Sequence, residues 1–256
     1  MHVRNIAYVR KPSPHLGDGL VTHVERTEID VERAFEQWRN YCGALGRCGW
    51  SLVEVPAVDE HPDGVFIEDT AVMFGELAVI TRPGAPERRG ETTGLADVFG
   101  NAGLAVEELP AGDLDGGDVL KIGSTAYVGV GGRTTAAGVE ALASIIAPRG
   151  WEVRPIPVTK VLHLKSAVTA LPDGTVIGYP PLIDDQTLFP CFLEVPEEHG
   201  GHVVLAADDT VLMSTSAPRT AEMLQARGLT TVCVDISEFE RLEGCVTCLS
   251  VRVRAS

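Results

Sequence analysis

A repeat runs along the chain and constrains its fold more than any other feature. Its unit consists of an apolar strand, a polar turn, a second apolar strand, an Arg or a Pro/Gly corner, and a helix rich in Ala, Glu and Leu. Arg88 and Arg133 occupy equivalent places 45 residues apart, and Arg219 follows 86 residues later, or two steps of 43. A further copy is therefore expected near residue 176. A fixed period of this size is typical of repeat architectures.

The repeat predicts the segments of four units. Two apolar strands are expected in each unit, and a helix follows them clearly in three of the four. The predicted segments are Thr70–Met73, Leu77–Thr81 and a helix around Thr92–Phe99; Val119–Ile122, Thr125–Val130 and a helix at Ala136–Ala147; Ala167–Leu171 and Thr175–Tyr179; and His202–Ala206, Thr210–Ser214 and a helix near Thr220–Arg227.

A fifth unit is shared between the two ends of the chain. The strand Asn5–Arg10 and the helix Val31–Leu45 lack a preceding strand, which a C-terminal strand around Cys245–Val253 would supply. Pairing of the two ends would close the units into a ring and remove free sheet edges. WD-type blades have a similar period, but they contain four strands and no helix. An ordinary α/β chain with coincidental spacing is the alternative.

Length and composition narrow the class of protein. The 256 residues, 45% of them hydrophobic, can bury one large core, and no interdomain linker appears, so residues 1–256 are expected to form a single domain. The formal charge of −15 argues against nucleic acid or an anionic membrane as a partner and favours a cationic small molecule. No apolar run approaches the ~20 residues of a membrane span. The polar N-terminus does not resemble a signal peptide, so a cytoplasmic protein with reduced thiols is expected.

Residues suited to chemistry follow or lie beside the predicted strands. Acidic groups occur in Phe-Ile-Glu-Asp and Leu-Asp-Gly-Gly-Asp motifs, one His lies in an apolar Val-Leu-His-Leu run, and one Cys lies in the β-branched C-terminal run. The His and the Cys are therefore both expected on strands. In a ring of like units, equivalent strand ends converge on the axis, so these side chains would share one pocket. The candidates are Asp63, Glu68, Asp69, Asp115, His163 and Cys248.

An acidic pocket with one Cys and one His suits a planar cation. Carboxylates bind a guanidinium through paired hydrogen bonds, and its central carbon is then open to attack by the Cys248 thiolate. A nearby imidazolium, or the bound cation itself, would favour that thiolate. His163 would protonate the departing amine and then activate water. Asp115 would orient the imidazole ring, as the third member of a catalytic triad does.

Each candidate also has a structural alternative. His163 and Cys248 could be core residues, and the acidic motifs could be turns or solvated strand ends. Cys245 and Cys248 have the spacing of a zinc pair or a redox dithiol. In an extended strand, however, residues three apart point to opposite faces, and no second Cys-x-x-Cys occurs. Neither metal binding nor dithiol function is therefore expected.

Six motifs together resemble the dimethylarginine dimethylaminohydrolase family, in the order in which that family carries them. They are Phe66–Asp69, Ile80–Arg89, Leu114–Asp118, Gly132–Thr134, Leu162–Ser166 and Thr247–Val251. The resemblance implies an α/β fold, the five-bladed propeller (pentein) of ββαβ-type modules around a central pocket. It also implies hydrolysis of Nω,Nω-dimethyl-L-arginine, and of the monomethylated form, to L-citrulline, with no metal or other cofactor.

The resemblance assigns roles by position. Cys248 matches the nucleophile, His163 the general acid and base, and Asp115 the carboxylate that orients the His. The implied substrate-binding set is Asp63 and Asp69 for the guanidinium with Glu68 beside them, Arg88 and Arg133 for the substrate carboxylate, Leu20 on the turn-rich lid segment Pro12–Leu20, and Leu242, where a backbone carbonyl meets the α-amino group.

Three other functions fit part of the pattern. Arginine deiminase shares the fold and nucleophile implied here, but it usually carries an Asp two residues after the catalytic His, where this chain has Lys165. An amidinotransferase would pass the same covalent intermediate to an amine. A binding protein for cationic amino acids would need the carboxylates and not the thiol. Both a monomer and a homodimer are compatible with the sequence.

Overall fold

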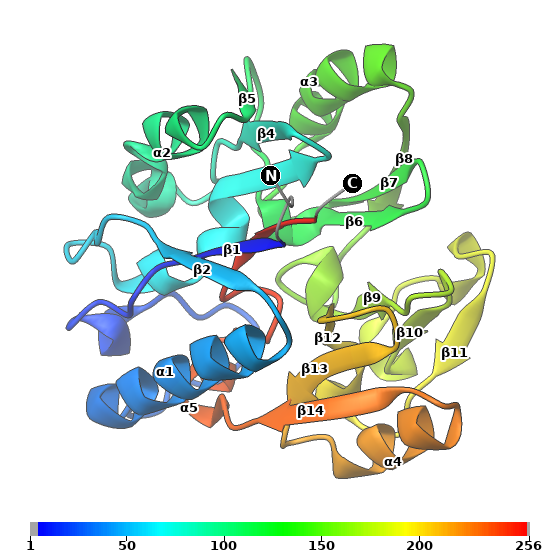
Figure 1. The fold of residues 1–256 in the computed structure, drawn as a ribbon. Helices are drawn as coiled ribbons and strands as arrows, with labels where there is room; N and C mark the ends of the chain where they lie inside the picture. The colour runs from blue at the N-terminus through cyan, green and yellow to red at the C-terminus, as the bar shows by residue number, and fades with distance from the viewer. Residues whose placement is uncertain (1–4, 255–256) are drawn as a thin grey trace.

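Five small sheets surround a common axis in the computed structural model, which describes residues 5–254. Each sheet has three strands, and Figure 1 shows the sheets following one another around the molecule as blades. In every blade the first and second strands are antiparallel, and the third strand is parallel to the second. The five-bladed α/β propeller expected from the sequence is therefore the observed fold.

The two ends of the chain close the ring by building one blade together. Its elements are β15 (Val251–Val253), β1 (Ile6–Val9), α1 (Val31–Arg47) and β2 (Ser51–Glu54). The last strand pairs antiparallel with the first, placing Ile6 opposite Val253. In Figure 1 the red β15 accordingly lies beside the blue β1. The predicted sharing of a blade between the ends is confirmed.

Three blades follow the repeat closely, with strands within a residue or two of the predicted ones. Each has a helix between its second and third strands, which the parallel connection requires. They are β3 (Ala71–Phe74), β4 (Leu77–Ile80), α2 (Leu95–Asn101), β5 (Ala105–Glu108); β6 (Val119–Ile122), β7 (Thr125–Val130), α3 (Ala136–Ile146), β8 (Glu152–Pro157); and β12 (Val203–Leu205), β13 (Thr210–Ser214), α4 (Pro218–Ala226), β14 (Thr230–Val234), followed by α5 (Ser237–Glu240).

The remaining blade departs from the repeat at its helix. Its strands are β9 (Val168–Ala170), β10 (Val176–Gly178) and β11 (Phe192–Glu194). Two short 3-10 helices, η8 (Pro180–Leu182) and η9 (Gln186–Leu188), connect the second strand to the third. The adjacent Pro180 and Pro181 lack the backbone donors that a continuing α-helix would need. The weak helix signal in this copy of the repeat thus has a local cause.

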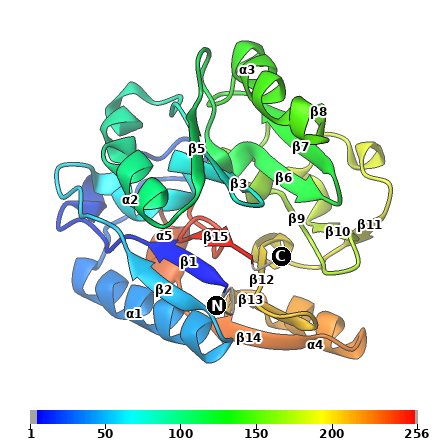
Figure 2. The same ribbon diagram turned by 45° about the horizontal axis from the view of Figure 1, so that its top comes forward.

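The helices cover the outside of the ring, and the first strand of each blade faces the axis. Figure 2 shows α1 to α4 at the periphery. Asp30 caps the start of helix α1, because its side chain accepts a hydrogen bond from Arg33 N at 3.0 Å. The helix buries Ala34, Tyr41 and Leu45 against the strands. An axial cavity has residues of β3, β6, β9, β12 and β15 in its walls. The segments just before these strands are therefore brought together.

Two predicted strands are shorter than their sequence patterns suggested. Residues 246–249 form a turn, and only Val251–Val253 are assigned to a strand. Cys248 N donates to Cys245 O at 3.1 Å, and Cys248 O accepts from Glu68 N, so turn and cross-blade hydrogen bonds replace those of a sheet. His163 likewise precedes a 3-10 turn, and its strand begins only at Val168. The expectation that His163 and Cys248 lie on strands was wrong, because both occupy the turns that lead into axial strands.

Among residues 5–254, no helix combines the length and the apolar composition that crossing a membrane would require.

Candidate active site

A pocket at one end of the axis gathers residues from three of the segments that precede the inner strands, together with loops around them. It brings together eight of the ten predicted site residues. Its walls consist of Leu20, Asp63, Phe66, Asp69, Arg88, Arg133, Leu162, His163, Leu242, Glu243, Gly244 and Cys248. Asp115 lies directly behind His163, whereas Glu68 faces elsewhere. The convergence expected of a ring of like units is thus present.

His163 is buried and surrounded by carboxylates. Its Nε2 lies 2.9 Å from Asp115 Oδ2, and its Nδ1 lies 3.8 Å from Asp69 Oδ1. Burial alone would lower the pKa of the imidazole, but Asp69, Asp115 and Asp118 outweigh it and raise the pKa to about 9. The ring is therefore protonated at neutral pH. It can donate a proton as a general acid.

Asp115 is completely buried and held in place from two sides. Its Oδ1 accepts a hydrogen bond from Gly84 N at 2.7 Å, while Oδ2 contacts the imidazole. Gly117 lets the His approach, because a Cβ there would lie 2.8 Å from His163 Nδ1 and 2.7 Å from Asp69 Oδ1. Any larger residue at 117 would displace the ring or the carboxylate. The geometry matches the orienting role that the resemblance implies for Asp115.

Asp118 supports the same arrangement, although the sequence pattern did not single it out as a site residue. Its Oδ1 accepts from Leu164 N at 2.8 Å, and its Oδ2 accepts from Thr134 Oγ1 at 2.6 Å. These bonds fix the turn that carries His163 to the blade before it. Burial raises the pKa of Asp118 to about 6, despite the opposing effect of the imidazolium. The second Asp of Leu-Asp-Gly-Gly-Asp was the available signal.

Asp69 faces the pocket and is fixed by a buried ion pair. Arg88 Nη1 donates to Asp69 Oδ2 at 2.6 Å, and Gly117 N donates to Oδ1 at 2.9 Å. Burial would raise the pKa of Asp69, but His163 and Arg88 outweigh it and lower the pKa to about 2. Asp69 therefore stays ionised and is available to a cation. Burial instead raises the pKa of Asp63, the other predicted guanidinium-binding carboxyl.

Arg88 makes more hydrogen bonds within the protein than the sequence suggested. Besides Asp69, it donates from Nε and Nη2 to the two oxygens of Glu91 at 2.9 and 2.8 Å, and it lies only 4% exposed. Glu91, which the sequence reasoning missed, is completely buried beside it. Such paired bonds hold the guanidinium rigidly. The structure thus uses Arg88 chiefly to position Asp69.

Arg133 has the opposite character and is half-buried at the pocket rim. Its Nη1 is buried without a hydrogen-bond partner, and its Nη2 lies 3.5 Å from Thr22 Oγ1. A buried guanidinium donor without a partner is unfavourable until an acceptor arrives. Arg133 is therefore the better placed of the two arginines to bind an anionic group of a ligand.

The segment around Leu20 is fastened across the pocket. Leu20 N donates to both oxygens of Asp63, at 3.2 and 3.1 Å. Thr22 N and His23 N donate to the carboxylate of Glu243 at 2.6 and 2.9 Å. Glu243 itself has φ of 60°, the only non-Gly residue with positive φ in the described part of the chain. Of the predicted lid segment Pro12–Leu20, Leu20 lines the pocket, as does Leu242, and its role as a lid stays a prediction.

Cys245 and Cys248 lie side by side, which corrects the expectation that they point apart. Their sulfurs are 3.3 Å apart, because the backbone between them turns instead of extending. The hydrogen bond with Cys248 lowers the pKa of the Cys245 thiol to about 5. The same bond, together with burial, raises the pKa of Cys248 well above its ordinary value. The pair therefore holds one proton between two sulfurs.

Glu68 does not line this pocket. Its carboxylate pairs with Lys165 Nζ at 2.6 Å and with Arg252 Nη2 at 3.3 Å, on the other side of the turn that carries Asp69. Successive side chains of that short turn point in different directions, so only one of the two neighbouring carboxylates can face the pocket. The expectation that Glu68 lies beside the guanidinium-binding residues is not what the structure shows.

Asp69, Asp115 and His163 also present ligand atoms within 4.8 Å of one another, as a metal site would. Their atoms are already engaged, however. His163 Nε2 contacts Asp115, and Arg88 contacts Asp69. Two carboxylates around an imidazolium satisfy the charge of this group without an ion. The arrangement suits proton transfer, and the absence of a metal stays a prediction.

A closed ring of such blades, with a thiol, an imidazolium and ionised carboxylates at one end of its axis, defines a guanidine-modifying enzyme of the pentein class. The family model described as arginine deiminase matches residues 54–193. A curated protein from Streptomyces coelicolor, N(G),N(G)-dimethylarginine dimethylaminohydrolase, is 58% identical over 249 residues, covering 97% of this chain and 96% of that protein.

Two further comparisons agree. The protein of the same name from Pseudomonas aeruginosa is 32% identical over 248 residues, covering 95% of this chain and 97% of the relative. A solved structure of that organism's enzyme, a Cys-to-Ser mutant complexed with citrulline, superposes with a TM-score of 0.89 at 30% identity, covering 97% of this chain and 99% of that one. The chain belongs to the dimethylarginine dimethylaminohydrolase family.

Proposed function

We propose that the protein hydrolyses Nω,Nω-dimethyl-L-arginine, and the monomethylated form, to L-citrulline and dimethylamine or methylamine. One observation carries the proposal: the Cys248 thiol, the His163 imidazolium and the Asp63 and Asp69 carboxylates line the same small pocket. A planar cation held by the carboxylates presents its central carbon to the sulfur and its amino group to the acid. The names of the two relatives support the same substrate.

Substrate binding uses charges at both ends of the amino acid. Asp69 is ionised and faces the pocket, so it pairs with the guanidinium, and Asp63 lies across from it. The unpartnered Nη1 of Arg133 donates to the substrate carboxylate. The Leu242 carbonyl oxygen accepts a hydrogen bond from the α-amino group of the substrate. Because Leu20 N is hydrogen-bonded to the Asp63 carboxylate in the closed pocket, residues 20–23 must move aside before substrate enters.

Covalent catalysis follows from this placement. The bound guanidinium offsets the burial of a thiolate, so Cys248 passes its proton to the Cys245 sulfur 3.3 Å away, and the Cys248 thiolate attacks the central carbon. His163 gives its proton to the departing dimethylamine, which leaves a thiouronium ester on Cys248. Neutral His163 then takes a proton from water, and the resulting hydroxide releases citrulline and regenerates the thiol. Asp115 holds the ring during both transfers.

A product assay tests the substrate and the reaction together. The purified protein is given dimethylarginine, monomethylarginine or arginine, with and without an acceptor amine such as glycine, and citrulline, ammonia and dimethylamine are measured. We expect citrulline and dimethylamine in equal amounts from dimethylarginine, with no effect of glycine. Higher kcat/KM on arginine with release of ammonia would indicate a deiminase instead. Formation of guanidinoacetate would indicate an amidinotransferase.

A second measurement separates an enzyme from a binding protein. A haloacetamidine carries a planar amidinium and a leaving group, so it is expected to label Cys248 with one equivalent, and dimethylarginine is expected to protect the thiol. Tight binding of dimethylarginine without labelling or turnover would indicate a binding protein. We further infer that residues 1–256 act as one catalytic domain, in the cytoplasm, as a monomer or a homodimer.

A further inference from the structure

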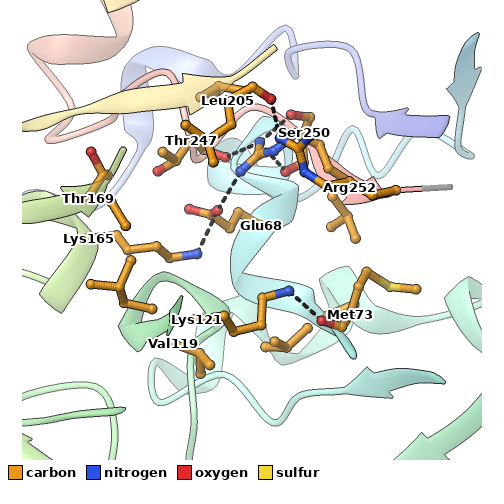
Figure 3. A pocket seen from close by; sticks show the side chains of 18 of the residues that line it. Glu68, Met73, Val119, Lys121, Lys165, Thr169, Leu205, Thr247, Ser250 and Arg252 are labelled. Carbon is orange, nitrogen blue, oxygen red and sulfur yellow. Dashed lines mark hydrogen bonds and ion pairs between the residues drawn. The ribbon is translucent and has the colours of Figure 1, made fainter. Parts of the chain in front are cut away.

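A second cavity lies on the axis behind the active pocket. It has a volume of about 300 Å³ and is surrounded by the first strands of all five blades. Figure 3 shows Glu68 in the middle, with the Lys165 ammonium and the Arg252 guanidinium directed at it. The same view shows Lys121 reaching across the cavity to the carbonyl oxygen of Met73. No residue of this cavity takes part in the chemistry proposed above.

Positive charge gathers here although the whole chain carries −15. The ionisable residues in the cavity walls are four cations, Lys121, Lys165, Arg252 and Arg254, and one carboxylate, Glu68. When Lys121 is protonated, the chain thus places an excess of three positive charges around a water-accessible space inside an acidic protein. Like charges in a confined, low-dielectric space repel one another unless an anion is present.

Two of these cations are not neutralised by the single carboxylate. Lys165 and Arg252 pair with Glu68 at 2.6 and 3.3 Å. Lys121 Nζ instead contacts the Met73 carbonyl and lies 5.5 Å from the centre of the Phe74 ring. Arg254 contacts the Leu205 carbonyl and the Trp50 ring. Dipoles and ring faces attract a cation without cancelling its charge, so a net positive field remains.

We propose that this cavity binds a small multivalent oxyanion of the size of phosphate. Such an anion fits the volume and accepts hydrogen bonds from several of the cationic groups at once. Its oxygens would complete the hydrogen bonds of Lys121 and Arg254, which have no carboxylate partner within the described residues. Inorganic phosphate and a small polycarboxylate share this chemistry, and the test below separates them.

The protonation of Lys121 supports the assignment. Desolvation by the surrounding blades and the neighbouring Lys165, Arg252 and Arg254 lower its pKa to about 7, against a smaller opposing effect of Glu68, although Lys121 itself is exposed to solvent. A bound anion would raise this pKa again and take up a proton. We therefore expect the affinity for the oxyanion to fall as the pH rises from 6 to 9. The loss should be ~10-fold or less, because water in the cavity screens the charges.

The cavity is linked to the active pocket through three short segments. Glu68 precedes Asp69, Lys165 follows His163 by two residues, and Thr247 precedes Cys248. An anion that draws Lys165 away from Glu68 would pull on the turns that carry Asp69 and His163. Occupancy of the cavity is therefore expected to change kcat more than KM, since the groups that move belong to the chemistry.

Calorimetric titration with sodium phosphate tests the site. The protein is saturated with citrulline so that phosphate cannot occupy Arg133, and chloride at equal ionic strength is the blank. We expect saturable binding of one phosphate, weakened at least ~5-fold in Lys121→Met. Arg154→Met, which removes an exposed cation outside both cavities, is expected to bind as wild type. Citrate in place of phosphate shows which oxyanion the cavity prefers.

Two results would overturn the proposal. One is equal phosphate affinity in wild type and Lys121→Met, and the other is the absence of saturable heat with either oxyanion. Phosphate that raises KM and is displaced by citrulline would show binding at the active pocket only. Because binding is measured without turnover, these results do not depend on the reaction proposed above.

A second inference comes from the two adjacent thiols and rests on the proposed function for its effect on turnover. Cys245 Sγ and Cys248 Sγ lie 3.3 Å apart. The bond from Cys248 N to Cys245 O closes a turn of the kind whose end Cα atoms are within ~7 Å. A disulfide needs Cα atoms about 4.4–6.8 Å apart. The backbone therefore permits the two sulfurs to bond with little movement.

We propose that Cys245 and Cys248 form a reversible disulfide that switches the enzyme off. With hydrogen peroxide as oxidant, the thiolate of the pair attacks one peroxide oxygen, becomes a sulfenic acid and releases hydroxide. The second sulfur then displaces hydroxide from the first, so two thiols and one peroxide give one disulfide and two waters. The nucleophile is then unavailable, and a dithiol restores it.

Peroxide treatment followed by peptide mass mapping tests this. In wild type we expect a peptide with linked 245 and 248, lower by two hydrogen atoms, and loss of activity that dithiothreitol reverses. Cys245→Ser cannot form the link, so Cys248 is expected to proceed to sulfinic acid, with a loss that dithiothreitol does not reverse. Oxygen addition at Cys248 in wild type, with no linked peptide, would overturn the proposal. The mapping also separates this pair from the exposed Cys191 and Cys233.

Discussion

The two cavities on the axis present charged groups in different arrangements. The active pocket holds the carboxylates of Asp63 and Asp69, and the neighbouring Asp115 and Asp69 raise the pKa of His163. The cavity behind it holds four cations around Glu68, and there the pKa of Lys121 is lowered. One protein thus maintains two sites with different sets of charges a few residues apart.

The contrast shows how the turns before the inner strands work. Three of these turns send one side chain to the active pocket and a near neighbour to the cavity behind it, as with Asp69 and Glu68, or His163 and Lys165. The charged side chains of the active pocket therefore have sequence neighbours that line the second cavity with a different set of charges. Substitutions of such neighbours should have different consequences, and three predictions exploit this.

The largest effect is expected for the nucleophile. Cys248→Ser replaces the sulfur with a much weaker nucleophile at the same position, so kcat/KM for dimethylarginine should fall by at least ~10³-fold. Binding of citrulline, which depends on the carboxylates and Arg133, should change by less than ~3-fold. Calorimetry and the citrulline assay measure the two quantities. A variant that kept most of its turnover would rule out the covalent scheme.

The neighbouring carboxylates should separate catalysis from stability. Asp69→Asn removes the charge that faces the substrate cation and His163, so kcat/KM should fall by ~10²-fold or more. Glu68→Gln leaves Lys165 and Arg252 without their carboxylate. It should lower the free energy of unfolding by ~1–3 kcal/mol while kcat/KM stays within ~10-fold.

Urea unfolding and steady-state kinetics on both variants decide this split. If Glu68→Gln abolished turnover and left the unfolding midpoint unchanged, Glu68 would belong to the guanidinium-binding set after all.

The smallest effect concerns the pH dependence of stability, where the two cavities oppose each other. The pKa of His163 is about 9 in the folded protein and ordinarily 6.5, so its stabilisation is complete below pH 6.5 and is lost as the pH rises through 9. This amounts to ~3 kcal/mol at most. The pKa of Lys121 is lowered from 10.5 to about 7, so the unfolded state holds that proton more tightly, and stability rises as the pH increases above 7.

Removal of Lys121 should therefore expose the His163 effect. In Lys121→Met the free energy of unfolding should fall between pH 7 and pH 9 by ~1 kcal/mol more than in wild type, a modest figure because water reaches Lys121. Urea midpoints at the two pH values, measured with reductant present, give the comparison. Equal slopes for the two proteins would show that the cavity does not perturb Lys121.

Much of the fold followed from the repeat, because a strand–strand–helix unit carries its own local signals. The pair of strands β6 and β7 lies where the sequence predicted it, because alternating apolar residues and tight turns act within ~10 residues. The blade that β15 and β1 share was predicted as well. The turns at His163 and Cys248 were not predicted, because the β-branched and apolar residues next to them in the sequence are typical of strands. What bends them is hydrogen bonding to other blades, such as Glu68 N to Cys248 O.

The sequence alone determined the ring of five units and predicted which groups react, since both are encoded by residue types at regular spacing. Only the tertiary structure decided which way each side chain faces. It turned Glu68 away from the pocket, engaged Arg88 with Glu91 and set Cys245 against Cys248. These outcomes depend on contacts between residues far apart in the chain, and a pattern along one segment carries no information about the segment that will pack against it.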